Sequence, residues 1–294
     1  AQELDIPIEH IEISAEIDTR ANPYDWNTVA SKFTFMGGNA VIKASREMLR
    51  KMKDVAAQAL RTDPENLLHA NGEVYHRHSP ERRMTYKQIA LGYMYPNGTG
   101  IGGPLISSGS SIADGLTNLH PETGQGNPAA VWTFGAHAVE IEVDIETGHV
   151  DVLKVASAFD IGQVINEKLV YGQICGGVVQ GLGSALLEGY KFNADQQLMN
   201  PSFTDNKIPT MKDIPMEIVP IYIENPQQNG PYGARGVGEH PMISIPSAIG
   251  NAVYDALGIN FHVLPLSPEA IALGIASGKK SILCTDTDCL PGRS

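Results

Sequence analysis

Cysteine and basic residues are scarce in this sequence, and each shortage excludes a class of protein. Only three cysteines occur among 294 residues. So few thiols exclude a disulfide framework and favour a reducing compartment, which predicts a cytoplasmic location. They also exclude an iron–sulfur cluster held by this chain, because such clusters take four thiolates. The 21 basic residues stand against 33 acidic ones, and the formal net charge of −12 argues against a nucleic-acid partner.

Long apolar runs and nucleotide-binding motifs are missing as well. No stretch approaches the roughly twenty apolar residues that cross a bilayer, so we expect no membrane partner. Ala1–Pro7 is polar from its first residues, so we expect no signal peptide. Gly98–Gly103 superficially matches a dinucleotide-binding turn, but Pro104 and serines follow it, which favours a loop. Cys284 and Cys289 lack further ligands nearby for a tetrahedral metal site, so we interpret them as part of a solvated tail.

The fold class follows from the order of the expected elements. Apolar residues make up 42% of the chain, which is enough for one large or two modest cores. Strands and helices mix without regular alternation, which favours an α+β protein with two mixed α/β lobes. We expect a first lobe at 1–130, which includes a Gly-, Pro- and Ser-rich excursion at 61–130. The second lobe spans 131–278, and a polar tail spans 279–294.

Periodicity predicts the individual elements. Alternation of apolar and acidic residues predicts a hairpin of 139–143 and 150–154, with its turn at 146–148. Helical spacing predicts a helix after Gly38, whose basic residues form a solvated face. The remaining expectations are the end of a helix at 1–5, a strand at 11–17, and helices at 164–190, 246–257 and 268–276.

Two glycine-rich segments carry the chemistry. Gly233–Pro241 presents one carboxylate, Glu239, ahead of the helix that Gly258 closes. Glycines at alternating positions allow a backbone to approach a bulky ligand, although a tight surface turn with a solvated glutamate explains this segment equally well. The second segment, Gly172–Gly183, lies in an apolar helix whose embedded glycines are Gly176, Gly177, Gly181 and Gly183. Because each costs roughly 1 kcal/mol relative to alanine, they indicate close helix packing, close cofactor approach, or both.

The order of these motifs resembles the xanthine oxidase family of molybdenum hydroxylases. The family pattern appears as Asp160-x-Gly162 with Asn166, then Gly172-Gln173 through Gly183, then Gly236-x-Gly238-Glu239-x-Pro241. Any one of these motifs is weak alone, whereas the ordered set is specific. The resemblance covers roughly residues 1 to 275, with further matches at 18–19, 23–24, 28–31, 37–40, 140–144, 147–148, 205–209 and 213–215.

The resemblance implies hydroxylation of an electron-poor carbon with water as the oxygen source. A pterin dithiolene holds the molybdenum in this family, so the protein supplies no metal ligand. Glu239 matches the general base, and a carboxylate in a partly dry, glycine-walled pocket has its pKa raised into a useful range. Gln173 matches the amide that approaches the metal or pterin. The remaining cofactor-binding residues implied are Ala30, Ser31, Gly176 and Gly238.

Three neighbouring residues keep simpler or open interpretations. Lys32 either supports the cofactor phosphate or points to solvent. His240 stands where the family often has proline, and we expect its side chain to pack away from the site. Cys175 is expected to be a small buried hydrophobe.

The resemblance also implies partners. The family's Gly-Gln-Gly motif is absent before Ala1. We therefore expect a lobe completed by a second molybdopterin-binding chain, as in split-subunit members such as nicotinate dehydrogenases, with iron–sulfur and FAD subunits beside it. The cofactor is expected in its cytosine dinucleotide form, and the substrate is expected to be an N-heterocycle. The alternatives are a C-terminal piece of a purine or aldehyde dehydrogenase, and a non-catalytic scaffold subunit, against which Glu239 and Gln173 argue.

Overall fold

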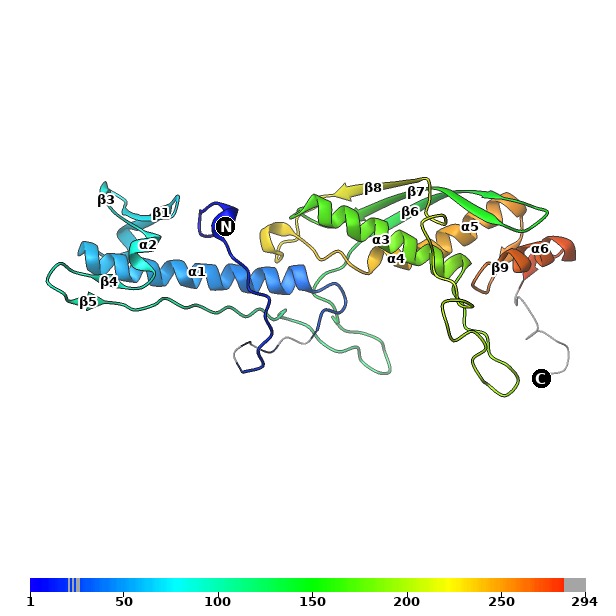
Figure 1. Ribbon diagram of the computed structural model, residues 1–294, viewed down its shortest axis with the longest axis horizontal. Coiled ribbons are helices and arrows are strands. Elements are labelled where there is room, and N and C mark those ends of the chain that lie inside the picture. Colours follow the sequence, from blue (N-terminus) through cyan, green and yellow to red (C-terminus); the bar gives the residue numbers. More distant parts are fainter. Residues whose placement is uncertain (21, 23, 25–26, 283–294) are drawn as a thin grey trace. The chain divides into compact units, whose positions relative to one another are not determined.

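The computed structural model describes residues 1–20, 22, 24 and 27–282. These residues form two compact units, one of residues 1–130 and one that begins at Val131 (Figure 1). Each unit has its own hydrophobic core. The mixture of helices with small sheets confirms the α+β class. Cys284, Cys289, Pro23 and most of the expected tail lie outside the described residues.

The first unit is organised around one long helix, α1 (Phe33–Leu60). The second half of α1 buries Leu49, Met52 and Val55 against an antiparallel sheet. The sheet consists of β1 (Leu67–Ala70), β2 (Glu73–His76) and β3 (Ser79–Thr85). The shorter elements are η1 (Ile8–His10), η2 (Pro64–Asn66), α2 (Tyr86–Ile89), β4 (Tyr93–Met94) and β5 (Gly100–Ile101).

Three expectations for this unit were wrong. The long helix begins at Phe33 and runs through Gly37 and Gly38, and Val41, expected on its buried face, is exposed. Residues 11–17 form no strand, because alternation yields a strand only where a neighbouring strand supplies hydrogen bonds, and no described residue pairs with this segment. Residues 1–5 form turns instead of the end of a helix.

The second unit contains a three-stranded sheet with helices on one side (Figure 1). The expected hairpin is confirmed: β6 (Gly135–Val143) pairs antiparallel with β7 (Val150–Asp160). The third strand, β8 (Glu217–Ile223), runs parallel to β7, which makes β7 the central strand. Asp160, the last residue of β7, lies opposite Ile223, the last residue of β8, so both strands end at the same edge.

Helices α3 (Glu167–Leu186) and α5 (Ile245–Leu257) form the core with this sheet. Gly258 ends α5 with a φ of +67°, which confirms it as the closing residue. The remaining elements are η3 (Pro231–Gly233), α4 (His240–Ile243), β9 (Asn260–Phe261), α6 (Pro268–Ser277) and β10 (Ser281–Ile282).

α3 is long and apolar enough, by length and composition alone, to cross a membrane, which the sequence expectation had excluded. Its apolar content has another physical explanation. Ile174, Val178 and Leu182 are almost fully buried in the core of the unit, as expected for a helix whose apolar face packs against a sheet.

Candidate functional site

The start of α3 is held firmly. The side chain of Asn166 caps the helix, accepting a hydrogen bond from the backbone N–H of Leu169 at 3.1 Å. The segment before the cap is fixed by Glu224, whose carboxylate accepts the backbone N–H of Val164 at 2.7 Å. Gln173 lies in the second turn of this helix and is exposed. The family glutamine therefore stands on an ordered element, not in a loop.

Four glycines of α3 divide into two sets. A side chain at Gly172 or Gly176 would meet no described atom within 4 Å, so the backbone is open there. At Gly177 an added Cβ would lie 2.6 Å from Cβ of Pro241. At Gly181 it would lie 2.6 Å from Cβ of Ile245. Of the two reasons that the sequence left open, helix packing accounts for Gly177 and Gly181, and an open approach is found at Gly172 and Gly176.

The close contact at Gly177 brings the two sequence motifs together. Pro241 lies in the first turn of α4, and Glu239 is the residue that precedes this helix. Gln173 and Gly177 are four residues apart on α3 and so lie on one face of it. The loop that carries Glu239 is therefore docked one turn away from Gln173. Glu239 and Gln173 are both exposed, so the described residues do not build the dry, glycine-walled pocket that we expected around the carboxylate.

A buried ion pair holds the other end of this loop. Arg235 Nη1 lies 2.5 Å from Asp160 Oδ1 and donates to the Asp160 carbonyl at 3.1 Å. Arg235 Nε donates to Gln227 at 3.2 Å, and its backbone N–H donates to the Ile161 carbonyl at 2.9 Å. Asp160 and Arg235 are only 8% and 9% exposed. Sequence reasoning noted Asp160 as a motif residue but missed its partner, because 75 residues separate the two.

The Asp160 carboxylate predicts an acid-dependent loss of stability. Its hydrogen bond to Arg235 holds the pKa of Asp160 below its ordinary value, with smaller help from Gly162 and Asn225. A lowered folded-state pKa stabilises the protein above the unfolded pKa of about 3.9, and this stability is lost as pH falls through the folded value.

We therefore expect Asp160→Asn to lower the free energy of unfolding at pH 7 by about 3–5 kcal/mol, because it leaves a buried guanidinium without its counter-charge. The difference from wild type should shrink as pH falls below about 4, because the unfolded wild-type chain binds a proton at Asp160 there, whereas the folded carboxylate binds it only at its lower pKa. Denaturant unfolding of both proteins from pH 3 to 7 measures this difference. A difference that does not change with pH would contradict the assignment.

Two histidines, His137 and His240, pack against Phe159 of β7. The rings of His137 and His240 contact Phe159 with centroid distances of 5.2 and 5.8 Å. Burial lowers the pKa of both, and Nε2 of each is buried without a hydrogen-bond partner among the described residues. The half-buried His240 ring contacts Phe159, as expected for a side chain packed away from the site. Cys175 differs from expectation, because it is only half-buried and its hydrogen bond with Tyr171 raises the pKa of that phenol.

In the first unit, Ala30 and Ser31 adopt an uncommon backbone just before α1. Both have positive φ, +52° and +54°, and the backbone N–H of Lys32 donates to the Val29 carbonyl at 3.3 Å. Consecutive positive φ values are typical of type I′ turns, which favour Asn-Gly. Building such a turn from Ala-Ser costs strain, and strain of this kind concentrates where a backbone contacts a ligand.

Metal-binding side chains do not gather in the part of the chain that the structure describes. No group of three His, Cys, Asp or Glu residues lies close enough to hold an ion. The open backbone at Gly172 and Gly176 would instead suit a bulky organic group that brings its own metal ligands. The residues present therefore fit a pterin cofactor that carries its metal.

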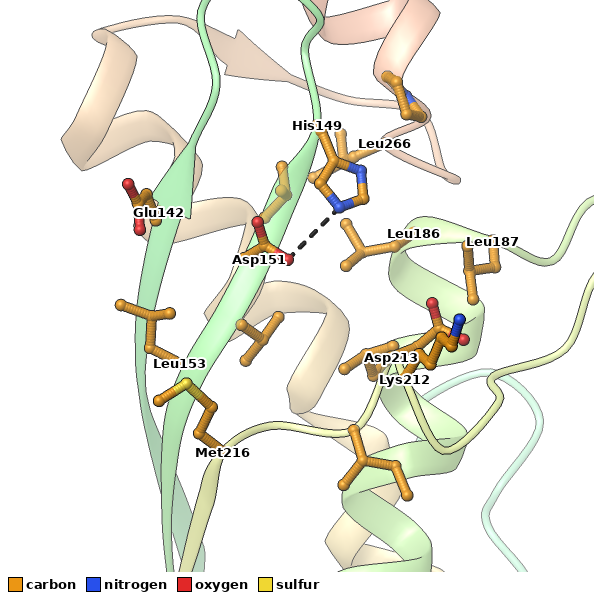
Figure 2. Close-up of a pocket in the computed structure, with 15 residues that line it drawn as sticks. Glu142, His149, Asp151, Leu153, Leu186, Leu187, Lys212, Asp213, Met216 and Leu266 are labelled. Atoms are coloured by element: carbon orange, nitrogen blue, oxygen red, sulfur yellow. Dashed lines mark ion pairs between the residues drawn. The ribbon is translucent and has the colours of Figure 1, made fainter.

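A cavity with a volume of about 430 Å³ lies elsewhere in the second unit (Figure 2). It surrounds the C-terminal end of α3, roughly 20 Å along the helix from Gln173. His149 and Asp151 form an ion pair of 3.4 Å at its wall. Asp213 closes a turn there by accepting from the backbone N–H and hydroxyl of Thr210, both at 2.7 Å. Part of the family match at 213–215 thus lines this cavity, away from Gln173.

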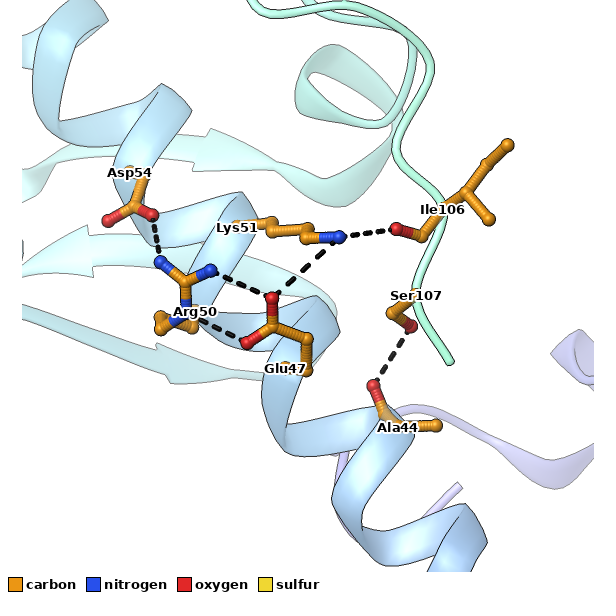
Figure 3. A network of polar contacts seen from close by, with 7 residues as sticks. All are labelled: Ala44, Glu47, Arg50, Lys51, Asp54, Ile106 and Ser107. Carbon is orange, nitrogen blue, oxygen red and sulfur yellow. Dashed lines mark hydrogen bonds and ion pairs between the residues drawn. The ribbon is translucent and has the colours of Figure 1, made fainter. Parts of the chain in front are cut away.

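Two basic residues of α1, Arg50 and Lys51, have polar partners close by (Figure 3). Arg50 forms ion pairs with Glu47 at 2.7 Å and with Asp54 at 2.8 Å. Lys51 donates to the carbonyl of Ile106 at 2.7 Å. This face is therefore a solvated helix surface that also holds the segment around residue 106.

The chain is similar to one family model and to several named proteins. Residues 1–215 match the model of the molybdopterin cofactor-binding domain. The chain is 32% identical over 276 residues to the nicotine 6-hydroxylase large subunit of Paenarthrobacter nicotinovorans, covering 92% of this chain and 32% of that protein. It is 30% identical over 273 residues to a putative xanthine dehydrogenase molybdenum-binding subunit of Escherichia coli (strain K12), covering 92% of this chain and 34% of that protein.

A solved structure, quinoline 2-oxidoreductase from Pseudomonas putida 86, superposes with a TM-score of 0.77 and 26% identity, covering 93% of this chain and 34% of that one. The chain thus spans about a third of the length of the relatives that it matches. The matched cofactor-binding domain ends at residue 215, before the loop that carries Glu239.

Proposed function

Because the chain belongs to the molybdopterin cofactor-binding family of xanthine oxidase-type molybdenum hydroxylases, we propose that it forms part of the catalytic unit of a multichain hydroxylase. The reaction proposed is hydroxylation of an electron-poor carbon in an N-heterocycle such as nicotinate, with water as the oxygen source. The observation that carries the proposal is the docking of the Glu239 loop onto α3 through Gly177 and Pro241, one turn from Gln173.

Each candidate site residue has a defined role in this proposal. The bound cofactor supplies molybdenum as the two-electron acceptor. Gln173 would donate to and accept from the cofactor without adding charge, and the backbone at Gly176 and Gly238 would allow close approach. The N–H groups of the strained turn at Ala30 and Ser31 would bind the phosphate.

Glu239 would act as the general base, accepting a proton from the water-derived oxygen. Its exposure in this chain means that the bound cofactor and the rest of the protein would exclude water around it. With substrate bound and water excluded, the environment of Glu239 would favour transfer of the proton to its carboxylate.

Partners form the remainder of the proposal. Ile165, Leu169 and Tyr171 expose apolar surface around the start of α3, which suits coverage by a second molybdopterin-binding chain. Electrons would leave through iron–sulfur and FAD subunits, and the cofactor would be the cytosine dinucleotide form. One relative, 29% identical, is a subunit of a 6-hydroxypseudooxynicotine dehydrogenase complex. We place the assembled enzyme in the cytoplasm.

A purine dehydrogenase is the second candidate. The Escherichia coli relative named as a putative xanthine dehydrogenase subunit is only slightly less similar than the nicotine hydroxylase subunit, at 30% against 32% identity. Both candidates use the same residues of this chain, so a substrate profile of the purified complex distinguishes them.

Native purification with quantified molybdenum, iron, flavin and nucleotide tests the proposal. We expect molybdenum at about one atom per copy of this chain, together with CMP released on acid treatment, iron and FAD on co-purifying subunits, and reduction of the complex by an N-heterocycle. A complex that contains this chain and no molybdenum would support the scaffold alternative instead.

A further inference from the structure

The loop that carries Glu239 is fixed at two points and is flexible by composition between them. Arg235 anchors it to the end of β7, and Pro241 anchors it against Gly177 of α3. Gly236 and Gly238 lie between these anchors. Because glycine has the largest backbone freedom, a loop of this composition needs fixed ends to hold one conformation.

The anchor at Arg235 is made of several polar contacts. The guanidinium contacts the carboxylate and the carbonyl of Asp160 and the amide of Gln227. The isolated bridge between Gly162 and Ala234 adds backbone contact beside it. Although breaking a buried ion pair is costly, the intact pair gains little stability over an apolar pair of similar volume, so stability alone does not explain why an ion pair is found here. What a planar guanidinium fork does provide is a fixed geometry.

We infer that the Asp160–Arg235 pair is a positioning device, which fixes Glu239 beside the exposed face of α3 at Gln173. This inference rests on the proposed role of Glu239 as the general base. Arg235 is four residues before Glu239 and does not touch the reacting atoms, so it acts through the loop. The end of the central strand thereby sets the place of the carboxylate, and a displacement of about 1 Å is enough to slow a positioned catalyst.

Hydrogen exchange in the assembled complex tests the anchor without measuring turnover. The backbone amides of 236–239 should exchange at least about tenfold faster in Arg235→Met than in wild type, and at an intermediate rate in Arg235→Lys. Lys154→Met is the matched control, because Lys154 lies on the same strand and forms an exposed pair of 2.8 Å with Glu217. In Lys154→Met, the backbone amides of 236–239 should exchange at the wild-type rate. Unchanged exchange in folded Arg235→Met overturns the inference.

Steady-state kinetics test whether the anchor serves Glu239. In Arg235→Met we expect kcat to fall by about tenfold or more, with KM changed less than about threefold and molybdenum content retained. Arg235→Lys should recover part of kcat. A kcat within about twofold of wild type, or a loss that molybdenum content accounts for entirely, would show that the pair does not position the base.

Two further results keep the outcomes distinct. If Arg235→Met fails to assemble, the double variant Asp160→Leu with Arg235→Met replaces it in both measurements, because it leaves no uncompensated buried charge. Failure of that double variant as well would make the pair a folding requirement and overturn the inference. Full activity in Glu239→Gln would refute the proposed role of Glu239 as the base. The hydrogen-exchange measurement does not depend on that role, so it would still show whether Arg235 holds the loop in place.

Discussion

Glu239→Gln should lower kcat/KM of the assembled enzyme by about 10²–10⁴-fold, the usual cost of removing a general base. The amide keeps the size and shape of the carboxylate but cannot accept the proton, so the loss should fall in the chemical step. Glu239 is exposed in the structure and belongs to no core cluster. Molybdenum content and Tm should therefore stay at their wild-type values.

Stopped-flow reduction of the enzyme by substrate measures this chemical step directly. Glu146→Gln is a matched control, because Glu146 is an exposed residue in the β6–β7 turn of the same unit. It removes the same charge from the chain and should leave the rate unchanged. Activity of Glu239→Gln within a factor of a few of wild type would remove Glu239 from the mechanism.

Gly176→Val and Gly177→Val should fail in opposite ways, although the glycines are adjacent. A side chain at Gly176 meets no described atom within 4 Å, so this variant should fold with a normal Tm. If the cofactor occupies that space, molybdenum content should fall by at least about tenfold, because the added bulk blocks close approach. Gln173→Ala, which deletes only one hydrogen-bonding group worth about 0.5–1.5 kcal/mol, should retain molybdenum and lose activity.

Gly177→Val places its Cβ 2.6 Å from Pro241, in the packed contact between α3 and α4. Overpacking of this kind typically costs about 1–3 kcal/mol, so Tm should fall and molybdenum should be lost only as the fold is lost. Gly250→Val in α5 is the control, because a Cβ added at Gly250 also meets no described atom within 4 Å. This variant should keep its molybdenum and its Tm. Metal content and thermal unfolding, measured on each variant, separate the two effects. A stable Gly176→Val protein with full molybdenum would show that this face is not at the cofactor.

The sequence predicted elements whose signal is local. Alternation along 139–143 and 150–154 identified the β6–β7 hairpin, because a half-buried strand exposes every second residue. Gly258 ended α5 as expected, since a left-handed closing residue favours glycine. The segment 11–17 shows the limit of such patterns. Its isoleucines alternate like a strand, yet Ile13 and Ile17 are 85% and 90% exposed, because no described neighbour supplies the partner.

The order of motifs along the chain was sufficient to identify the family and its cofactor, since that order is a property of the sequence alone. What the glycines of α3 do was decided only by tertiary structure, because their neighbours in the sequence do not reveal which side of the helix faces α4 and which remains open. The Asp160–Arg235 pair also needed the fold, since a side chain's partner 75 residues away is set by where β7 ends and where the loop returns. The sequence thus predicts which residues carry the chemistry, whereas only packing shows how they are held, because contact between distant parts of a chain depends on distance in space.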